Sequence, residues 1–166
     1  ALTDLEKAHN LKPHIKQIWD LLISLMLETK NYSRAIYVLI KMIEVDPNHE
    51  KSFSLLTACN QEADDPALAI ISFETVLEVR PYDFVNFLNL GVALQRQGKN
   101  EKAIEHFKKA LSIKPDYADA YYNMGNALKD QGKLDEAIQA FTNAISTKPD
   151  YADAYNNMGC TLKEQG

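Results

Sequence analysis

The sequence predicts an all-α solenoid, a stack of helix pairs, and three observations support this fold class. Proline recurs every 34 residues, at positions 13, 47, 81, 115 and 149. A fixed period of this length is typical of repeat proteins, whose units bury their apolar faces only against their neighbours. Apolar residues within each period follow the three- and four-residue offsets of amphipathic helices. The six glycines form two series with the same spacing, Gly91, Gly125 and Gly159, and Gly98, Gly132 and Gly166.

Residues 118–151 illustrate one repeat, which holds two helices. The apolar or small residues at helical offsets are Tyr121, Met124, Gly125, Leu128, Ala137, Ile138, Phe141, Ala144 and Ile145. Gly132 lies between the two halves, where a residue that tolerates a positive φ can end the first helix. Pro149 ends the second helix, because proline cannot continue the hydrogen-bond ladder. Asp150 is expected to cap the helix that follows.

The same phase predicts the elements of the whole chain, which we number by repeat position with residue 118 as position 1. The chain is expected to be a single array, with a second helix at 1–15, full repeats at 16–49, 50–83, 84–117 and 118–151, and a first helix at 152–166. Position 4 is a large aromatic residue in Trp19, Phe53, Phe87, Tyr121 and Tyr155. Position 20 is always alanine and position 24 is large, as in Ala103 and Phe107 or Ala137 and Phe141. A large residue against a small one allows close approach of two helices.

These residues resemble the tetratricopeptide repeat family, whose order of aromatic, leucine-glycine, alanine, phenylalanine and proline positions they follow. The resemblance is strongest from Pro81 to Gly166, where PDYADAYYNMGNALKDQG and PDYADAYNNMGCTLKEQG are near copies. It is weaker in the first half, where Ile23 and Thr57 replace the glycine of position 8. The resemblance implies a right-handed superhelix of antiparallel helix pairs that binds proteins or peptides in a concave groove.

Composition excludes several classes of function. The net charge is −5, with 18 basic and 23 acidic residues, so the chain lacks the basic excess of a nucleic-acid binder. No run of apolar residues is long enough to span a membrane, and we expect no membrane partner. The N-terminus lacks the blocks of a signal peptide, which favours a cytoplasmic location if the true N-terminus is present.

The sequence offers no active site, metal site or cofactor site, and we therefore predict that the chain is not an enzyme. His9 and His14 are separated by Pro13, and His49 and His106 have no metal-ligand spacing around them. Repeat geometry spreads these side chains along the stack rather than around one pocket. Cys59 and Cys160 are expected to be free thiols, with Cys59 in the core.

The side of each first helix opposite its core should line the groove implied by the family. This side carries repeat positions 2, 6, 9 and 13, with positions 5 and 12 beside them. The candidate peptide-binding residues are Asn89, Gln95, Arg96, Tyr122, Asn123, Asn126, Lys129, Asn156, Asn157 and Lys163. Asn89, Asn123 and Asn157 share position 6, and a row of amides can bond the backbone of an extended peptide. The alternative interpretation is that these asparagines are solvated residues copied with a duplicated repeat.

Three functions remain open. The first is a scaffold that binds an extended peptide or a partner helix in the groove. The second is the substrate-recruiting arm of a larger enzyme, because the asparagine row is similar to that of the O-linked N-acetylglucosamine transferases, which are protein glycosyltransferases. The third is head-to-tail self-association through ends that expose Tyr155, Met158 and Leu162. Capture of an acidic C-terminal tail is disfavoured, because position 6 carries no basic residue.

Overall fold

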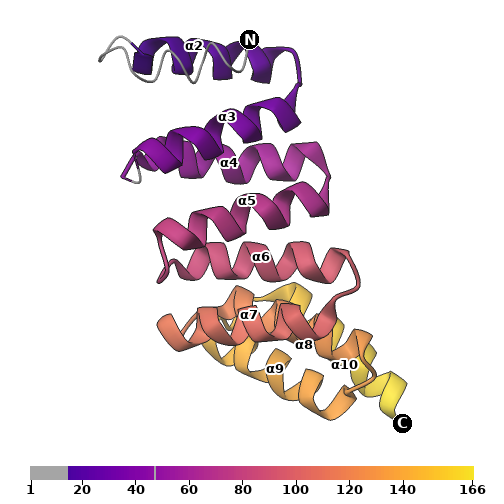
Figure 1. Cartoon of the computed structure of the whole chain (residues 1–166). Helices are drawn as coiled ribbons and strands as arrows, with labels where there is room; N and C mark the ends of the chain where they lie inside the picture. The colour runs from indigo at the N-terminus through magenta and orange to yellow at the C-terminus, as the bar shows by residue number, and fades with distance from the viewer. Residues whose placement is uncertain (1–14, 47) are drawn as a thin grey trace. The chain divides into compact units, whose positions relative to one another are not determined.

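The computed structural model describes residues 15–46 and 48–166, without the side chains of 15–20 and 22. All regular secondary structure in these ranges is helical, which confirms the predicted all-α class (Figure 1). The helices are α2 (Ile15–Glu28), α3 (Tyr32–Val45), α4 (Glu50–Ala63), α5 (Pro66–Val79), α6 (Phe84–Arg96), α7 (Asn100–Ile113), α8 (Ala118–Asp130), α9 (Leu134–Thr147) and α10 (Ala152–Gln165). The helix predicted within residues 1–15 and the side chain of Trp19 lie outside the described part of the chain.

The chain divides into two compact units, residues 1–65 and 66–166. In the first unit, α3 packs against both α2 and α4. Ile36, Leu39 and Ile43 lie on one face of α3 and are fully buried. Apolar residues three and four apart thus place a continuous stripe of this helix in the core, as the sequence pattern predicts.

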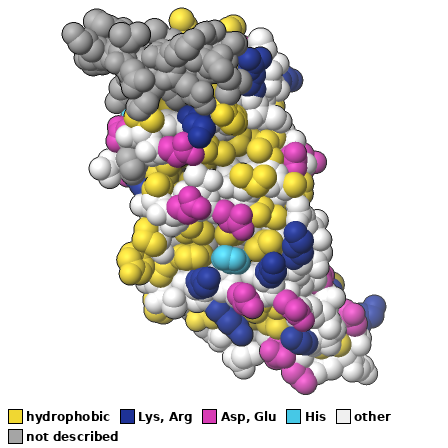
Figure 2. Space-filling model, viewed as in Figure 1, with side chains coloured by type: hydrophobic (Ala, Val, Ile, Leu, Met, Phe, Trp, Pro, Cys, Tyr) yellow, Lys and Arg dark blue, Asp and Glu magenta, His cyan; other side chains and the backbone are white. Residues whose placement is uncertain are grey.

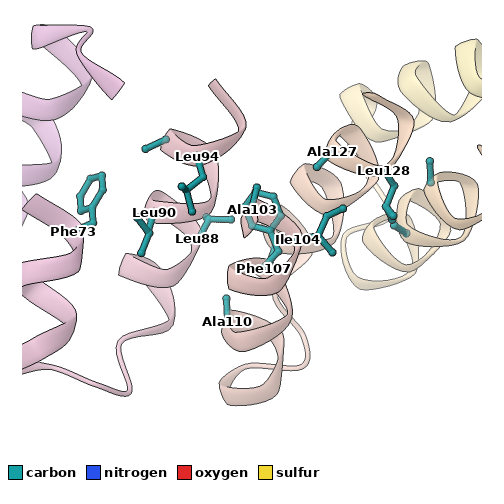
Figure 3. Close-up of a cluster of buried hydrophobic side chains, with 14 of the residues drawn as sticks. Phe73, Leu88, Leu90, Leu94, Ala103, Ile104, Phe107, Ala110, Ala127 and Leu128 are labelled. Atoms are coloured by element: carbon teal, nitrogen blue, oxygen red, sulfur yellow. The ribbon is translucent and has the colours of Figure 1, made fainter. Parts of the chain in front are cut away.

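In the second unit, each helix from α5 to α10 packs against the next one along the chain. Phe107 and Phe141 are fully buried, as are Ala103 and Ala137 one turn before them. Figure 3 shows Phe107 on the side of α7 that faces Leu88 and the other α6 leucines. The predicted combination of a small and a large residue is therefore buried on α7 and on α9, where each helix packs against the preceding first helix.

The glycines of position 8 allow these phenylalanines to approach the first helices. A Cβ atom added at Gly91 would lie 2.4 Å from Cε1 of Phe107, and one added at Gly125 would lie 2.6 Å from Cε1 of Phe141. Gly159 on α10 has no such neighbour within 4 Å. The ring of the second helix thus rests directly on the backbone of the first helix in two of the repeats.

The buried side of the first helices is wider than the sequence analysis predicts. Ala120, at position 3, is fully buried although it lies outside the predicted core positions, whereas Tyr121 and Met124 at the predicted core positions 4 and 7 are half-buried. The reason is that α8 packs both on α9 and on α7, the second helix of the preceding repeat. Two flanking helices bury a broader stripe than one does.

Two other expectations are wrong. Asp150 does not cap α10, because the N-cap residue is Tyr151 and no side chain bonds the free amides there. Asp83 does cap α6, and its carboxylate accepts hydrogen bonds from the backbone amides of Val85 and Asn86. Met158 was expected to be exposed at the end of the stack, but it is half-buried and packs on the core of the second unit.

The turns between paired helices use the left-handed backbone conformation at position 15. Gly98 and Gly132 have φ values of 73° and 72°, which confirms that glycine ends these first helices. In the first unit, Lys30 and Asp64 occupy this position with φ values of 54° and 50°. The turn geometry is thus retained where the glycine is absent.

The two cysteines have different environments, and both are free thiols. Cys59 is buried in α4, and burial raises the pKa of its thiol. A buried thiol of raised pKa is a poor nucleophile, so Cys59 acts as a small core residue, as the sequence predicts. Cys160 is exposed on α10.

The charged surface of the second unit mixes both signs. On its visible face, acidic and basic side chains are interspersed (Figure 2). This face carries no broad basic field of the kind that nucleic-acid binding needs.

We expect the stability of the second unit to depend on pH through His106. Burial lowers the pKa of His106 below its ordinary value of 6.5, and the charge of Lys109 lowers it further. The unfolded chain therefore binds this proton more readily than the folded chain. Above pH 6.5 His106 is neutral in both states and costs no stability. As the pH falls below 6.5 the unfolded chain takes up the proton first, so the free energy of unfolding decreases.

Urea unfolding on both sides of this pH measures the loss. The imidazole stacks on Phe87 with ring centroids 5.9 Å apart, and its Nδ1 atom is buried without a hydrogen-bond partner among the described residues. His106→Gln should reduce the dependence on pH, since glutamine does not titrate. An identical loss in the variant would show that other groups cause it.

Candidate peptide-binding surface

All ten predicted binding residues lie on the first helices α6, α8 and α10 of the second unit. α8 packs against both of the other two helices. We call the side of these helices that carries the ten residues the candidate surface. Arg96, Asn156 and Lys163 are exposed on it, and the other seven residues are half-buried.

Tyr122, Asn126 and Asn157 form one hydrogen-bonded cluster between α8 and α10. The Nδ2 amide of Asn157 donates to the Tyr122 hydroxyl at 3.1 Å and to Oδ1 of Asn126 at 2.8 Å. The three residues occupy positions 5, 9 and 6 of two successive repeats. The structure therefore joins side chains that the sequence analysis treats separately.

The other two asparagines of position 6 have different surroundings. Nδ2 of Asn123 donates to the backbone carbonyl of Asp119, one turn earlier on its own helix, at 2.8 Å. Nδ2 of Asn89 is buried and has no hydrogen-bond partner among the described residues. The asparagine row is thus regular in sequence but not in hydrogen bonding.

Polar contacts between successive first helices form one edge of the candidate surface. Gln95 donates to Oδ2 of Asp130 at 3.0 Å. Lys129 and Glu164, one repeat later, lie 3.8 Å apart as an ion pair. Both pairs join position 12 of one repeat to position 13 of the next. Three of these four residues are charged, whereas the cluster of Tyr122, Asn126 and Asn157 is amide and aromatic.

Tyr151, which lies immediately before α10, belongs to this surface although its position in the sequence did not predict it. Its ring packs on Tyr122 with centroids 5.0 Å apart, and the Lys148 ammonium lies 4.6 Å from its centroid. Burial, and next the hydrogen bond to Asp119, raise the pKa of the Tyr151 hydroxyl, so it is protonated and donates to the carboxylate. The sequence does contain an indication of its importance, because a tyrosine stands at position 34 before both near-copy first helices.

The preceding repeat contains a related aromatic group. Tyr117, also at position 34, contacts Phe84 edge-on with centroids 5.2 Å apart. The Lys114 ammonium lies 5.1 Å from the centroid of Phe84 and 5.5 Å from that of Tyr117. Burial raises the pKa of the Tyr117 hydroxyl. The start of each of these first helices therefore carries a lysine and aromatic rings in contact.

The described residues hold no cluster of three or more histidine, cysteine, aspartate or glutamate side chains placed to bind a metal ion. Within the same residues, no helix is long and apolar enough to cross a bilayer. That the chain is not an enzyme and binds no cofactor remains a prediction.

Comparison with known proteins identifies the repeats. The tetratricopeptide repeat family model matches residues 91–132 and 125–166, which include the last six residues of α6 and all of α7 to α10. This chain contains tetratricopeptide repeats. The predicted family and the helix-pair solenoid fold are thereby confirmed.

Solved structures share the tetratricopeptide fold over most of this protein. A crystal structure of MamA matches with a TM-score of 0.74 and 26% identity, covering 87% of this chain and 84% of MamA. YrrB, described as a tetratricopeptide protein with an unusual peptide-binding site, matches with a TM-score of 0.66 and 22% identity over 89% of this chain and 76% of its own.

A third similar structure contains a bound peptide. The first tetratricopeptide domain of Spaghetti (RPAP3), bound to the HSP90 peptide SRMEEVD, matches with a TM-score of 0.63 and 21% identity over 66% of this chain and 86% of its own. No curated protein matches the tetratricopeptide chain in sequence. Its likeness to the glycosyltransferases thus remains an expectation from the residues.

Proposed function

We propose that this tetratricopeptide protein is a protein–protein interaction scaffold that binds an extended segment of a partner along the candidate surface. Structures of similar fold include one with a bound peptide and one described by its peptide-binding site. Both support a role in protein–protein interaction. The chain supplies binding groups and no reaction of its own.

The hydrogen bonding of the candidate surface supports the proposal that the partner binds there as an extended peptide. The amide nitrogens of Asn123 and Asn157 are occupied within the protein. Their amide oxygens are left to accept from the backbone of a ligand, which every residue except proline can satisfy. A surface of this kind favours an extended peptide with varied side chains.

We expect the simultaneous replacement of Asn89, Asn123 and Asn157 by alanine to weaken peptide binding by about tenfold or more, as for the loss of one or two hydrogen bonds. The probe is a peptide selected from a random library on the intact chain, and its affinity is measured by calorimetry. The helical circular dichroism should not change, because the three side chains are only half-buried.

Asn143→Ala, on the second helix α9, is the matched control and should leave the affinity unchanged. Equal affinity of the triple variant and the parent would remove these asparagines from the binding site. Failure to select any peptide would contradict the proposed function itself.

The candidate surface does not favour an acidic C-terminal tail such as SRMEEVD. Of its basic residues, Lys129 already pairs with Glu164. Positions 5 and 6 of α6, α8 and α10 carry only leucine, tyrosine and asparagine. The partner we propose is therefore recognised through its backbone more than through a terminal carboxylate.

A second candidate function is self-association, which the exposed side of α10 favours. Tyr155 and Leu162 are each 48% exposed, and Gly159 has open space above it. The opposite end of the proposed head-to-tail contact, within residues 1–15, lies outside the described residues except for Ile15. Light scattering at rising concentration tests this function, and a strictly monomeric chain would contradict it.

A further inference from the structure

We infer that the exposed side of α10 packs antiparallel on the same side of α10 in a second copy of the chain, so that two copies close into a dimer. This inference rests on the second candidate function, self-association, and gives it a geometry. A head-to-tail contact extends without limit unless it forms a ring, whereas an isologous contact closes with two copies.

The two sides of α10 have different surroundings. The helix packs on α9 and α8, and Ala154 and Thr161 on this packed side are fully buried. The opposite side carries a row of residues spaced alternately by three and four, which is the spacing of a helix–helix seam. Its members are Ala152, Tyr155, Gly159 and Leu162, all of them exposed. Small and large side chains thus alternate along the exposed row.

Antiparallel pairing matches the small residues of one copy with the large residues of the other. A pair centred on Asn157 places Tyr155 opposite Gly159 of the second copy, and Leu162 opposite Ala152 of the second copy. The two-fold symmetry repeats both contacts. Each layer of the pair then combines a large side chain with a small one, which permits close approach of the two helices.

Gly159 offers a second copy a contact that the preceding repeats make within the chain. The ring of Phe107 lies on the backbone of α6 at Gly91, and the same kind of contact joins α9 to α8. No atom lies within 4 Å of a Cβ added at Gly159. A second copy cannot supply the phenylalanines of α7 and α9, because both are fully buried. Tyr155, which is 48% exposed, is a large ring that it can supply.

The charges of α10 favour the antiparallel orientation over the parallel one. The helix has an acidic residue in its first turn, Asp153, and a basic residue in its last turn, Lys163. Antiparallel pairing brings the first turn of one copy beside the last turn of the other, whereas parallel pairing brings like charges together. Glu164, also in the last turn, pairs with Lys129 of its own copy at 3.8 Å and therefore opposes the attraction less.

The contact is small, and we expect the dimer to be weak. α10 has 14 residues, which corresponds to a length of about 20 Å. A single pair of such helices is expected to bury less than the ~1,200–2,000 Å² of a standard interface. The dimer should therefore dissociate on dilution.

Sedimentation equilibrium of the intact chain over a dilution series tests the dimer. We expect monomers and dimers, and no larger species. Leu162→Glu places a charge in the helix pair and should weaken the association by about tenfold or more. Ile71→Glu makes the same change at a site on α5 that is 58% exposed, and it should leave the association unchanged.

Three results of the dilution series would overturn the inference. They are a chain that remains monomeric at the highest concentration, equal responses of the two variants, and growth beyond dimers, which would instead support a head-to-tail contact. The helical circular dichroism of both variants should match that of the parent, because both replaced side chains are exposed.

The antiparallel register is tested by disulfide formation in a chain whose Cys160 is replaced by serine. Asn156 lies next to the two-fold axis of the pair, so Asn156→Cys should link two copies under mild oxidation. Ser146→Cys, at an exposed site on α9, is the matched control and should remain unlinked. Linkage of both variants alike, or of neither, would overturn this register.

A synthetic peptide with the sequence of α9, residues 134–147, tests a different occupant of the same side of α10. This peptide carries Ala137 and Phe141, the small and large residues with which second helices pack on first helices. Binding of this peptide by a chain that is otherwise monomeric would show that a second helix covers α10, and would overturn the inference.

The library-selected peptide separates the dimer from the scaffold function. Leu162→Glu should leave the affinity for that peptide unchanged, because Leu162 is not among the residues of the candidate surface. A chain that dimerises but selects no peptide would retain this inference and contradict the scaffold function. A chain that selects a peptide but never dimerises would retain the scaffold function and overturn this inference.

Discussion

Phe107→Ala is expected to lower the free energy of unfolding of the second unit by about 3–5 kcal/mol, as for other buried aromatic side chains. Phe107 is fully buried, and its ring lies on the backbone of α6 at Gly91. Alanine would leave a cavity between α6 and α7 that the fully buried Ala103 and Ala110 are too small to fill. Urea unfolding followed by circular dichroism measures the change.

Asn123→Ala is the comparison for Phe107→Ala. It removes one hydrogen bond from a half-buried side chain to its own helix, so the expected cost is at most about 1 kcal/mol. Similar losses in the two variants would mean that the assignment of core and candidate surface is wrong. A much larger loss for Phe107→Ala would agree with it.

Gly125→Ala is expected to destabilise the second unit by about 1–3 kcal/mol, although alanine is the better helix former. The added Cβ would lie 2.6 Å from Cε1 and 2.8 Å from Cδ1 of Phe141. Phe141 is fully buried and has little room to retreat, so α8 and α9 must move apart. Thermal and urea unfolding should both report the loss.

Gly159→Ala is the matched control, because Gly159 occupies the same repeat position in α10. No atom lies within 4 Å of the added Cβ. The variant should therefore gain stability by up to about 1 kcal/mol through helix propensity alone. Effects of the same sign at Gly125 and Gly159 would contradict the close contact of Phe141 with the helix backbone.

Much of the fold could be predicted from the period of the sequence. The helical offsets, the glycine turns at Gly98 and Gly132, and the burial of Phe107, Phe141 and Cys59 all agree with the structure. Each of these features depends on residues within one repeat. The buried width of the first helices was underestimated, because Ala120 is covered by a second packing helix that the pattern of a single helix does not reveal.

The candidate site was less predictable than the core. The residue types and repeat positions of Asn123, Asn126 and Asn157 could be read directly, and so could the side of the helix that carries them. Tyr151 was missed because it precedes its helix and therefore lies outside the helical pattern. Its role depends on the contact with Tyr122, whose ring comes from the preceding repeat.

The sequence by itself determined the tetratricopeptide family, the helix pairs and the residues that line each first helix, because a 34-residue period constrains all of these within one unit. Only the tertiary structure decided which amide groups remain for a ligand. The two hydrogen bonds of Asn157 join residues 31 and 35 positions apart. They form only when successive repeats stack, because Tyr122 and Asn126 of the preceding first helix supply the acceptors. The corresponding residues of α6 are Leu88 and Val92, whose side chains cannot accept a hydrogen bond from Asn123.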